Sequence, residues 1–192
     1  RAYAGSANGG VWYWEEAHGA WRPVGSWGLQ PGMVAAGERA QLSLTIGALH
    51  VEFGRDGGDN DDPAGDVVYA GTGELRPGRI SSPGGKHGGI GVLKLEDPIA
   101  TVLANPGGVP WQVEGGTQML GKGIYRLARN PDFAVPGSPV ELVAATSDGL
   151  YFRSGNFVAG ADWQEVPRSQ FDHDADDRLV FTDALWSETS GL

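Results

Sequence analysis

The feature that most constrains the fold of this chain is a threefold internal repeat. Three segments of the 192-residue sequence have the same parts in the same order: an apolar strand ending in small residues, a glycine-containing turn, a second apolar or aromatic strand, a polar turn, and a tryptophan that opens a short strand. The copies begin at Tyr3, Val68 and Val143, and their tryptophans are Trp21, Trp111 and Trp163. Because repeated units bury their apolar faces by stacking on one another, the repeat predicts three similar structural units.

A further apolar strand precedes the second and third copies, at residues 44–53 and 123–128, and another closes the chain at 179–186. Four short strands joined by Gly-rich turns are typical of a propeller blade. We therefore predict an all-β chain, a β-propeller of four-stranded antiparallel blades with about three blades and a trailing strand. The expected units are 1–40, 41–119 and 120–176, followed by the trailing strand 177–192.

Two other fold classes fit the sequence less well. No window of a dozen residues keeps apolar side chains at helical spacing without an intervening Gly or Pro, so helices are not expected. A β-sandwich also uses short strands and tight turns, but it does not require a tryptophan at the same place in each unit. Three blades fall short of the roughly four to eight of closed propellers, so we expect a partial ring. The ring would be completed at its open sheet edges by further blades outside this chain or by neighbouring chains, or it would stay an open arc.

Composition and charge exclude several classes of partner. The net charge of −10, with 14 scattered Lys and Arg residues, argues against nucleic acid, because a phosphate backbone requires clustered cations. The absence of cysteine excludes disulfides and thiolate chemistry. No apolar run reaches the roughly 18 residues of a membrane span. The chain opens on Arg1 rather than Met, within an expected strand, so we expect a piece of a longer or processed polypeptide that is extracellular, periplasmic or at the cell surface.

The segments 68–74, 89–94 and 144–151 resemble the sialidase-like β-propeller superfamily, whose Asp-box (BNR) repeat has the form Ser-x-Asp-x-Gly-x-x-Trp. In that family the Asp accepts backbone hydrogen bonds that tie a turn, and the Trp packs between strands of the blade. The copies in this chain are degenerate, with Glu or Asn at some Asp positions. The resemblance assigns this structural role to Glu16, Trp21, Asp97, Trp111, Ser154, Asn156 and Trp163.

The superfamily includes two groups of glycoside hydrolases. Sialidases have an Arg-Ile-Pro segment, which is absent here. A central cavity could still be faced by Arg22, Arg126 and Arg153, but we expect the commoner arrangement, a solvated side chain on a blade surface. In xyloglucanase-like hydrolases a catalytic Asp lies in the first blade, and this chain has Ala7 at that position. Since glycoside hydrolysis requires two carboxyl groups that face one bond, the remaining candidates are Glu74 and Asp148. A carboxylate at a turn more often accepts backbone N–H bonds.

An acidic, glycine-containing segment is a candidate metal site. Asp56, Asp59 and Asp61 supply oxygen ligands of the kind that Ca²⁺ accepts, although the EF-hand spacing is absent. A solvated acidic loop is the alternative interpretation, as it is for the second acidic segment at residues 172–177. The four histidines lack metal-binding spacing, and no cofactor is required by any other motif.

Taken with the repeat, these observations predict a non-catalytic β-propeller module. Its expected role is protein or glycan binding, or scaffolding in a larger exported protein or assembly. The alternative is a part of a glycoside hydrolase, sialidase-like or xyloglucanase-like, whose remaining catalytic residues lie outside this chain.

Overall fold

The described residues of the chain form eleven β-strands and very little helix. The computed structural model describes residues 1–7, 10–16, 19–24, 45–54, 65–73, 88–99, 111–115, 118–131, 140–154, 163–171 and 179–186. The strands are β1 (Ala2–Gly5), β2 (Val11–Glu15), β3 (Ala20–Pro23), β4 (Ile46–Glu52), β5 (Val67–Gly73), β6 (Gly88–Glu96), β7 (Gln112–Glu114), β8 (Ile124–Arg129), β9 (Val140–Thr146), β10 (Gly149–Ser154) and β11 (Trp163–Glu165). A 3-10 turn, η4 (Arg168–Gln170), follows β11. The all-β prediction is confirmed.

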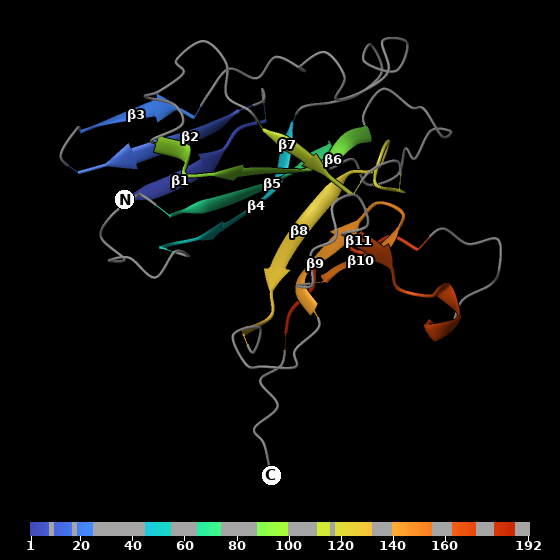
Figure 1. The fold of residues 1–192 in the computed structure, drawn as a ribbon. Coiled ribbons are helices and arrows are strands. Elements are labelled where there is room, and N and C mark those ends of the chain that lie inside the picture. The colour runs from blue at the N-terminus through green and yellow to red at the C-terminus, as the bar shows by residue number, and fades with distance from the viewer. Residues whose placement is uncertain are drawn as a thin grey trace.

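The strands form three antiparallel sheets that follow one another along the chain (Figure 1). The first sheet has the order β1-β2-β3, the second β4-β5-β6-β7 and the third β8-β9-β10-β11. Each sheet pairs consecutive strands, and none of the three closes on itself. Within the described parts of the chain, no helix is long and apolar enough to cross a membrane.

The three sheets repeat one register at the hairpin between their two long apolar strands. The equivalent pairs are Gly5 with Val11, Gly71 with Val92, and Ala145 with Leu150. In each sheet a glycine comes directly before the second residue of this pair. These glycines are Gly10, Gly91 and Gly149, with φ of 105°, 103° and 106°. L-residues rarely adopt this conformation, so this position favours glycine in all three sheets.

The same register places the three repeat tryptophans at equivalent positions. Trp21 lies opposite Trp14 in the first sheet, and Trp163 lies opposite Arg153 in the third. In the second sheet Gln112 pairs with Lys94, which puts Trp111 beside Leu95. The sheets are therefore equivalent along their outer strands as well as at the hairpin.

The first strand of the second and third sheets carries an irregularity at the same place. In β4, one residue lies between the partners of Thr72 and Gly71, and in β8 one residue lies between the partners of Thr146 and Ala145. An extra residue of this kind is a β-bulge, which bends the strand and increases its twist.

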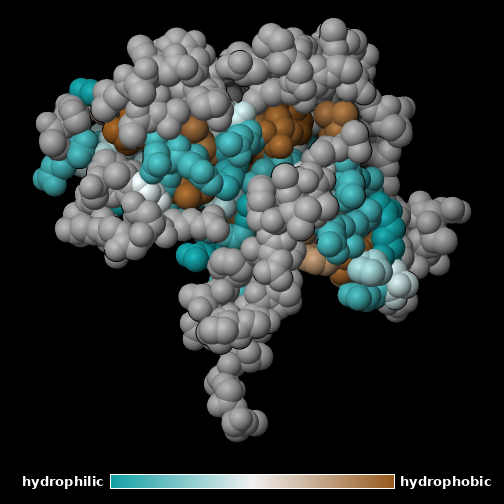
Figure 2. Space-filling model, viewed as in Figure 1, coloured by the Kyte–Doolittle hydropathy of each residue, from teal (hydrophilic) through white to brown (hydrophobic). Residues whose placement is uncertain are grey.

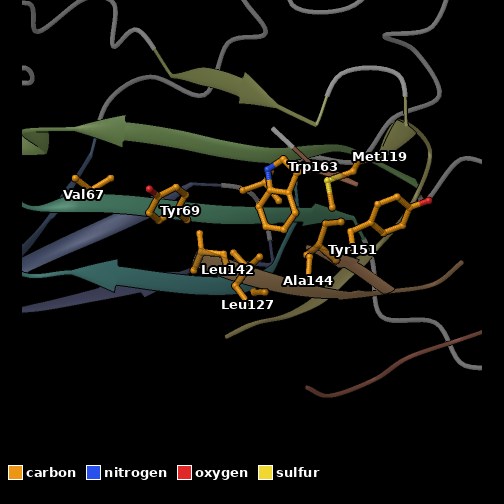
Figure 3. Packing of buried hydrophobic residues seen from close by; sticks show 11 residues of the cluster. Val67, Tyr69, Met119, Leu127, Leu142, Ala144, Tyr151 and Trp163 are labelled. Carbon is orange, nitrogen blue, oxygen red and sulfur yellow. The ribbon is translucent and has the colours of Figure 1, made fainter. Parts of the chain in front are cut away.

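The hydrophobic core lies in the two joints between consecutive sheets. One cluster contains Val11, Tyr13 and Val24 of the first sheet with Val68, Leu93 and Leu95 of the second. The other contains Val67, Tyr69 and Val92 of the second sheet with Leu142, Ala144, Tyr151 and Trp163 of the third. Figure 3 shows Tyr69, Leu142 and Trp163 together in this second joint.

Both faces of the middle sheet are covered by a neighbouring sheet, and both carry apolar side chains. Alternate residues of a strand point to opposite faces, so Val68 faces the first sheet whereas Val67 and Tyr69 face the third. On the side of the molecule drawn in Figure 2, the described surface is largely hydrophilic, with separate hydrophobic patches.

Residues 179–186, predicted as a trailing strand, do not form a strand in the structure. Two backbone hydrogen bonds attach this segment to the end of β9 and the start of β10. The Phe181 N–H donates to the Thr146 carbonyl at 3.0 Å, and the Gly149 N–H donates to the Leu179 carbonyl at 2.8 Å.

Candidate functional site

Asp148, one of the two predicted catalytic candidates, lies in the turn between β9 and β10. Its Oδ2 accepts a hydrogen bond from Lys122 Nζ at 2.9 Å, and its Oδ1 accepts one from Arg168 Nη2 at 2.8 Å. Burial favours a higher pKa for Asp148, but the hydrogen bonds from these two cations outweigh it and hold the pKa below its usual value. Asp148 therefore stays ionised at neutral pH and is occupied on both oxygens.

A second carboxylate shares one of these cations. Arg168 Nε donates to Glu165 Oε1 at 2.9 Å, so Asp148 and Glu165 flank one guanidinium. A glycosidase acid needs a raised pKa to hold a proton at neutral pH, and the shift at Asp148 has the opposite sign. Lys122 Nζ also lies 5.5 Å above the Tyr151 ring. The cluster holds η4 against the β9–β10 turn.

Several predicted site residues lie outside the described residues. These are the second catalytic candidate Glu74, the Asp-box position Asn156, the side chain of Ser154, and the proposed calcium ligands Asp56, Asp59 and Asp61. The parts of the chain that the structure does describe contain no group of three or more His, Asp or Glu side chains that could hold a metal ion.

The remaining Asp-box positions differ in environment. Glu16 is exposed in the turn after β2. Asp97 follows β6 with φ of 46°, and its Oδ1 accepts a hydrogen bond from the Gly65 N–H at 2.5 Å. Trp111 and Trp163 are buried, whereas Trp21 is exposed.

Arg153 was expected to be a solvated arginine, and that expectation is wrong. Its side chain is 2% exposed and lies in the joint between the second and third sheets. Two hydrogen bonds, from Nε at 2.9 Å and Nη2 at 3.1 Å, reach the carboxylate of Glu114, and Nη1 forms an ion pair with Glu141. The guanidinium also lies 5.5 Å from the centre of the Tyr69 ring, and Trp163 Nε1 donates to Glu114 at 3.2 Å. Burial acts to lower the pKa of Arg153, but the negative charge of Glu114 acts in the opposite direction. The net effect is a raised pKa, so the guanidinium stays charged.

The first joint contains its own buried ion pair. Arg1 donates to both oxygens of Asp66, from Nε at 3.1 Å and from Nη2 at 3.0 Å. The Tyr3 hydroxyl donates to the same carboxylate at 2.9 Å, and the Gly54 N–H does so at 3.0 Å. Four donors therefore compensate for the burial of Asp66, and the charge connects the first sheet to the second.

The first strands of the second and third sheets carry charged side chains whose ion pairs are longer than those in the two joints. Arg129 Nε lies 3.5 Å from Glu52 Oε1, and Arg126 Nε lies 3.4 Å from Asp183 Oδ1. Burial lowers the pKa of the neighbouring His50, and the charges of the two arginines lower it further against the opposing effect of Glu52. Arg126 is half exposed and Arg22 is exposed, as the solvated interpretation expects.

One face of the first sheet presents a row of tryptophans. The pairing of Ala4 with Trp12 and Pro23, and of Ala2 with Trp14 and Trp21, places these residues on a common face. The opposite face carries Tyr3, Val11 and Tyr13 and packs on the second sheet. We call the face formed by Ala2, Ala4, Trp12, Trp14, Trp21 and Pro23 the open tryptophan face.

Comparison with equivalent positions shows how unusual this face is. Trp21 is 49% exposed, whereas its equivalents Trp111 and Trp163 are 5% and 1% exposed. Trp12 is 38% exposed, whereas its equivalents Leu93 and Tyr151 are each 1% exposed. In the second and third sheets this face is covered by the preceding sheet. In the first sheet none of the three indoles belongs to either hydrophobic cluster of described residues.

The sequence contained a signal for this face that the repeat alignment did not use. The run from Val11 to Trp14 is apolar at every position, without the alternation of a strand that has one face in water. A strand with this pattern is typical of a sheet covered on both faces.

Comparisons of the chain with protein-family models, with curated proteins and with solved structures found no match.

Proposed function

We propose that this chain is a non-catalytic β-propeller module, a three-bladed arc that binds a protein or glycan partner or scaffolds a larger assembly. The open tryptophan face carries this proposal. Three indoles lie on a sheet face whose counterparts in the other two sheets are buried. Contiguous apolar surface of this kind marks an interaction site. An exported or cell-surface location accompanies the proposal.

The propeller interpretation is supported by the repetition of the joints. Three sheets pack face to face in series, and the second is covered on both faces, whereas a β-sandwich has only two packed sheets. The hairpin register, the left-handed glycine and the tryptophan position recur in every sheet, and the bulge recurs in β4 and β8. The degenerate Asp-box resemblance agrees with the tryptophan position.

The non-catalytic interpretation is supported by the way the carboxylates are used. Asp66 is bound by Arg1, Glu114 by Arg153, and Asp148 by Lys122 and Arg168. Each of these pairs connects elements of the fold. A hydrolase is favoured by one observation, the proximity of Asp148 and Glu165 to a shared arginine, and disfavoured by the low pKa of Asp148.

The test measures binding and turnover with the same set of proteins. The wild-type chain, the double variant Trp12→Ser/Trp21→Ser and the control Phe53→Ser are compared, since Phe53 is an equally exposed aromatic residue away from the open face. Binding to xyloglucan, β-glucan and sialylated glycans is measured by affinity electrophoresis, and self-association by sedimentation. We expect the affinity of at least one of these interactions to fall about tenfold or more in the double variant. The same interaction should keep its wild-type affinity in Phe53→Ser.

Two results would contradict the proposal. One is a wild-type chain that binds none of the glycans and does not self-associate, or that binds equally well after both tryptophans are replaced. The other is turnover of a fluorogenic glycoside or sialoside that Asp148→Asn abolishes, which would establish the hydrolase alternative.

A further inference from the structure

The two ends of the arc of sheets expose complementary faces. The open tryptophan face lies on the first sheet, on the side away from the second. At the other end, the third sheet buries Tyr151 and Leu142 against the second sheet and turns its opposite face outward. That outward face carries Val143, Leu150, Phe152 and Val166, all of them only half-buried. By the repeat, it is equivalent to the face of the first sheet that packs on the second.

The segment 179–186 lies where the inner strand of a following sheet would begin. Ile46 opens β4 by donating its N–H to the carbonyl of Ser6 in the first sheet. Phe181 donates in the same way to Thr146, the equivalent of Ser6 in the third sheet. The segment thus stands beside the third sheet as β4 stands beside the first. Its residue Leu185 is 78% exposed.

Among the described residues, no strand pairs with β1 on the side where this segment would lie. In the second and third sheets, β4 and β8 pair with β5 and β9, but β1 is the edge strand of the first sheet as described. Leu49 pairs with Ala70, and Leu127 pairs with Ala144. The equivalent pair is Ala184 with Ala4. The eleven strands and the segment together make three complete four-stranded blades.

The chemistry of the two exposed faces also matches. In the joint between the second and third sheets, Arg153 meets Glu114 and Tyr69. At the equivalent positions of the joint between the first and second sheets, Leu95, Val24 and Tyr3 form an apolar contact. If the third sheet of one chain faced the first sheet of another, Trp14 would meet Val143 and Val166. At these positions the contact would bury no charge.

We propose that two copies of this chain associate head to tail, with the open tryptophan face of each covered by the third sheet and segment 179–186 of the other. This inference rests on the proposed propeller architecture. Two such contacts close a ring of six blades, within the roughly four to eight that propellers use, whereas one copy gives three and three copies give nine. A head-to-tail contact that closes in this way produces a finite ring rather than a filament.

The first test is the mass of the 192-residue chain in solution. Sedimentation velocity at micromolar concentration is expected to give a species of twice the 20.2 kDa chain mass. Trp12→Asp and Leu185→Asp, at opposite ends of the arc, are each expected to shift the mass toward one chain. The control Phe53→Asp places a charge on an exposed aromatic residue outside both faces and is expected to leave the dimer intact. Circular dichroism of each variant checks that the sheets are retained, and Trp21→Asp serves as the alternative if Trp12→Asp unfolds.

Mixing the two end variants separates a head-to-tail contact from a symmetric one. Trp12→Asp keeps an intact third sheet and Leu185→Asp keeps an intact open face, so an equimolar mixture can form one good contact and should recover dimer. If two open faces bound each other instead, Leu185→Asp would remain dimeric alone, and the head-to-tail proposal would be wrong.

The predicted register gives a second, independent measurement. Because the chain has no cysteine, Ala4→Cys/Ala184→Cys introduces the sole thiols, and directly paired strand residues fall within disulfide reach. We expect oxidation to yield covalent dimers, and the control Ala2→Cys/Ala184→Cys, two residues out of register, to yield several-fold less. A wild-type chain that is monomeric at about 100 μM overturns the proposed dimer. The binding function itself would still stand if the open face then bound a glycan.

Discussion

Replacing Arg153 by leucine should destabilise the fold far more than a surface arginine would. The side chain is almost fully buried between the second and third sheets, and Glu114 and Glu141 are buried with it. Truncating the cation leaves two carboxylates without their principal partner. Removing one partner of a buried ion pair costs about 3–5 kcal/mol, which is a large part of the roughly 5–15 kcal/mol that holds an ordinary domain together.

The chain itself suggests how to separate loss of charge compensation from loss of packing. The neighbouring joint has Leu95 and Val24 where this one has Arg153 and Glu114. We therefore expect Arg153→Leu/Glu114→Val/Glu141→Met, which removes the arginine together with both of these carboxylates, to recover most of the stability lost in Arg153→Leu. The loss of the acceptor for Trp163 Nε1 limits the recovery by about 1–3 kcal/mol.

Urea unfolding followed by tryptophan fluorescence and by circular dichroism measures both variants, and coincident transitions justify a two-state fit. Arg22→Leu is the control for removing an exposed arginine and is expected to change the free energy of unfolding by less than about 0.5 kcal/mol. A cost of less than about 1 kcal/mol for Arg153→Leu would contradict the proposed role of the ion pair. A triple variant no more stable than the single one would contradict it as well.

Three further predictions concern the β9–β10 hairpin. Thr146→Val should cost about 1–3 kcal/mol, because the buried hydroxyl donates to the Gly149 carbonyl at 2.7 Å and accepts from the Asp148 N–H at 3.1 Å; equilibrium unfolding checks this. Gly149→Ala should cost about 1–3 kcal/mol, since φ is 106° and the new Cβ would lie 3.0 Å from a Glu165 oxygen; a thermal melt with no change in midpoint would contradict it. Because the pKa of Asp148 is lowered in the fold, its contribution to stability is complete above about pH 4 and is lost as the pH falls through the lower folded value. Asp148→Asn should therefore be less stable than wild type at pH 7, with a smaller difference at pH 2–3, and an equal difference at both pH values would refute this.

The strands could be predicted from the sequence because the evidence for them is local. Alternation of apolar residues and the flanking glycines placed a strand at 44–53, where the structure has β4 (Ile46–Glu52), and one at 123–128, where it has β8 (Ile124–Arg129). The tryptophans Trp21, Trp111 and Trp163 were aligned because each opens the last short strand of its copy, and the register places them at equivalent positions.

The buried charges could not be predicted in this way because their partners are distant in sequence. Arg153 follows the apolar run Leu150–Phe152 in its strand, and nothing nearby shows that Glu114, 39 residues earlier, will neutralise it. The cation that fixes Asp148 is 26 residues away, at Lys122. Such pairs depend on which sheet packs on which, and that requires the order of the sheets in space as well as the position of each strand.

The difference between the two joints bears on how the chain reaches its native arrangement. Similar sheets in one polypeptide are liable to dock on the wrong neighbour during folding, which is a characteristic failure of repeat proteins. If the third sheet docked on the first in place of the second, Arg153 would face Val24 instead of Glu114; it would keep Glu141 of its own sheet but lose its two hydrogen bonds to Glu114. The correct order would be favoured by these charged hydrogen bonds, each worth about 1.5–3 kcal/mol. Arg153 thus helps to specify that the third sheet packs on the second.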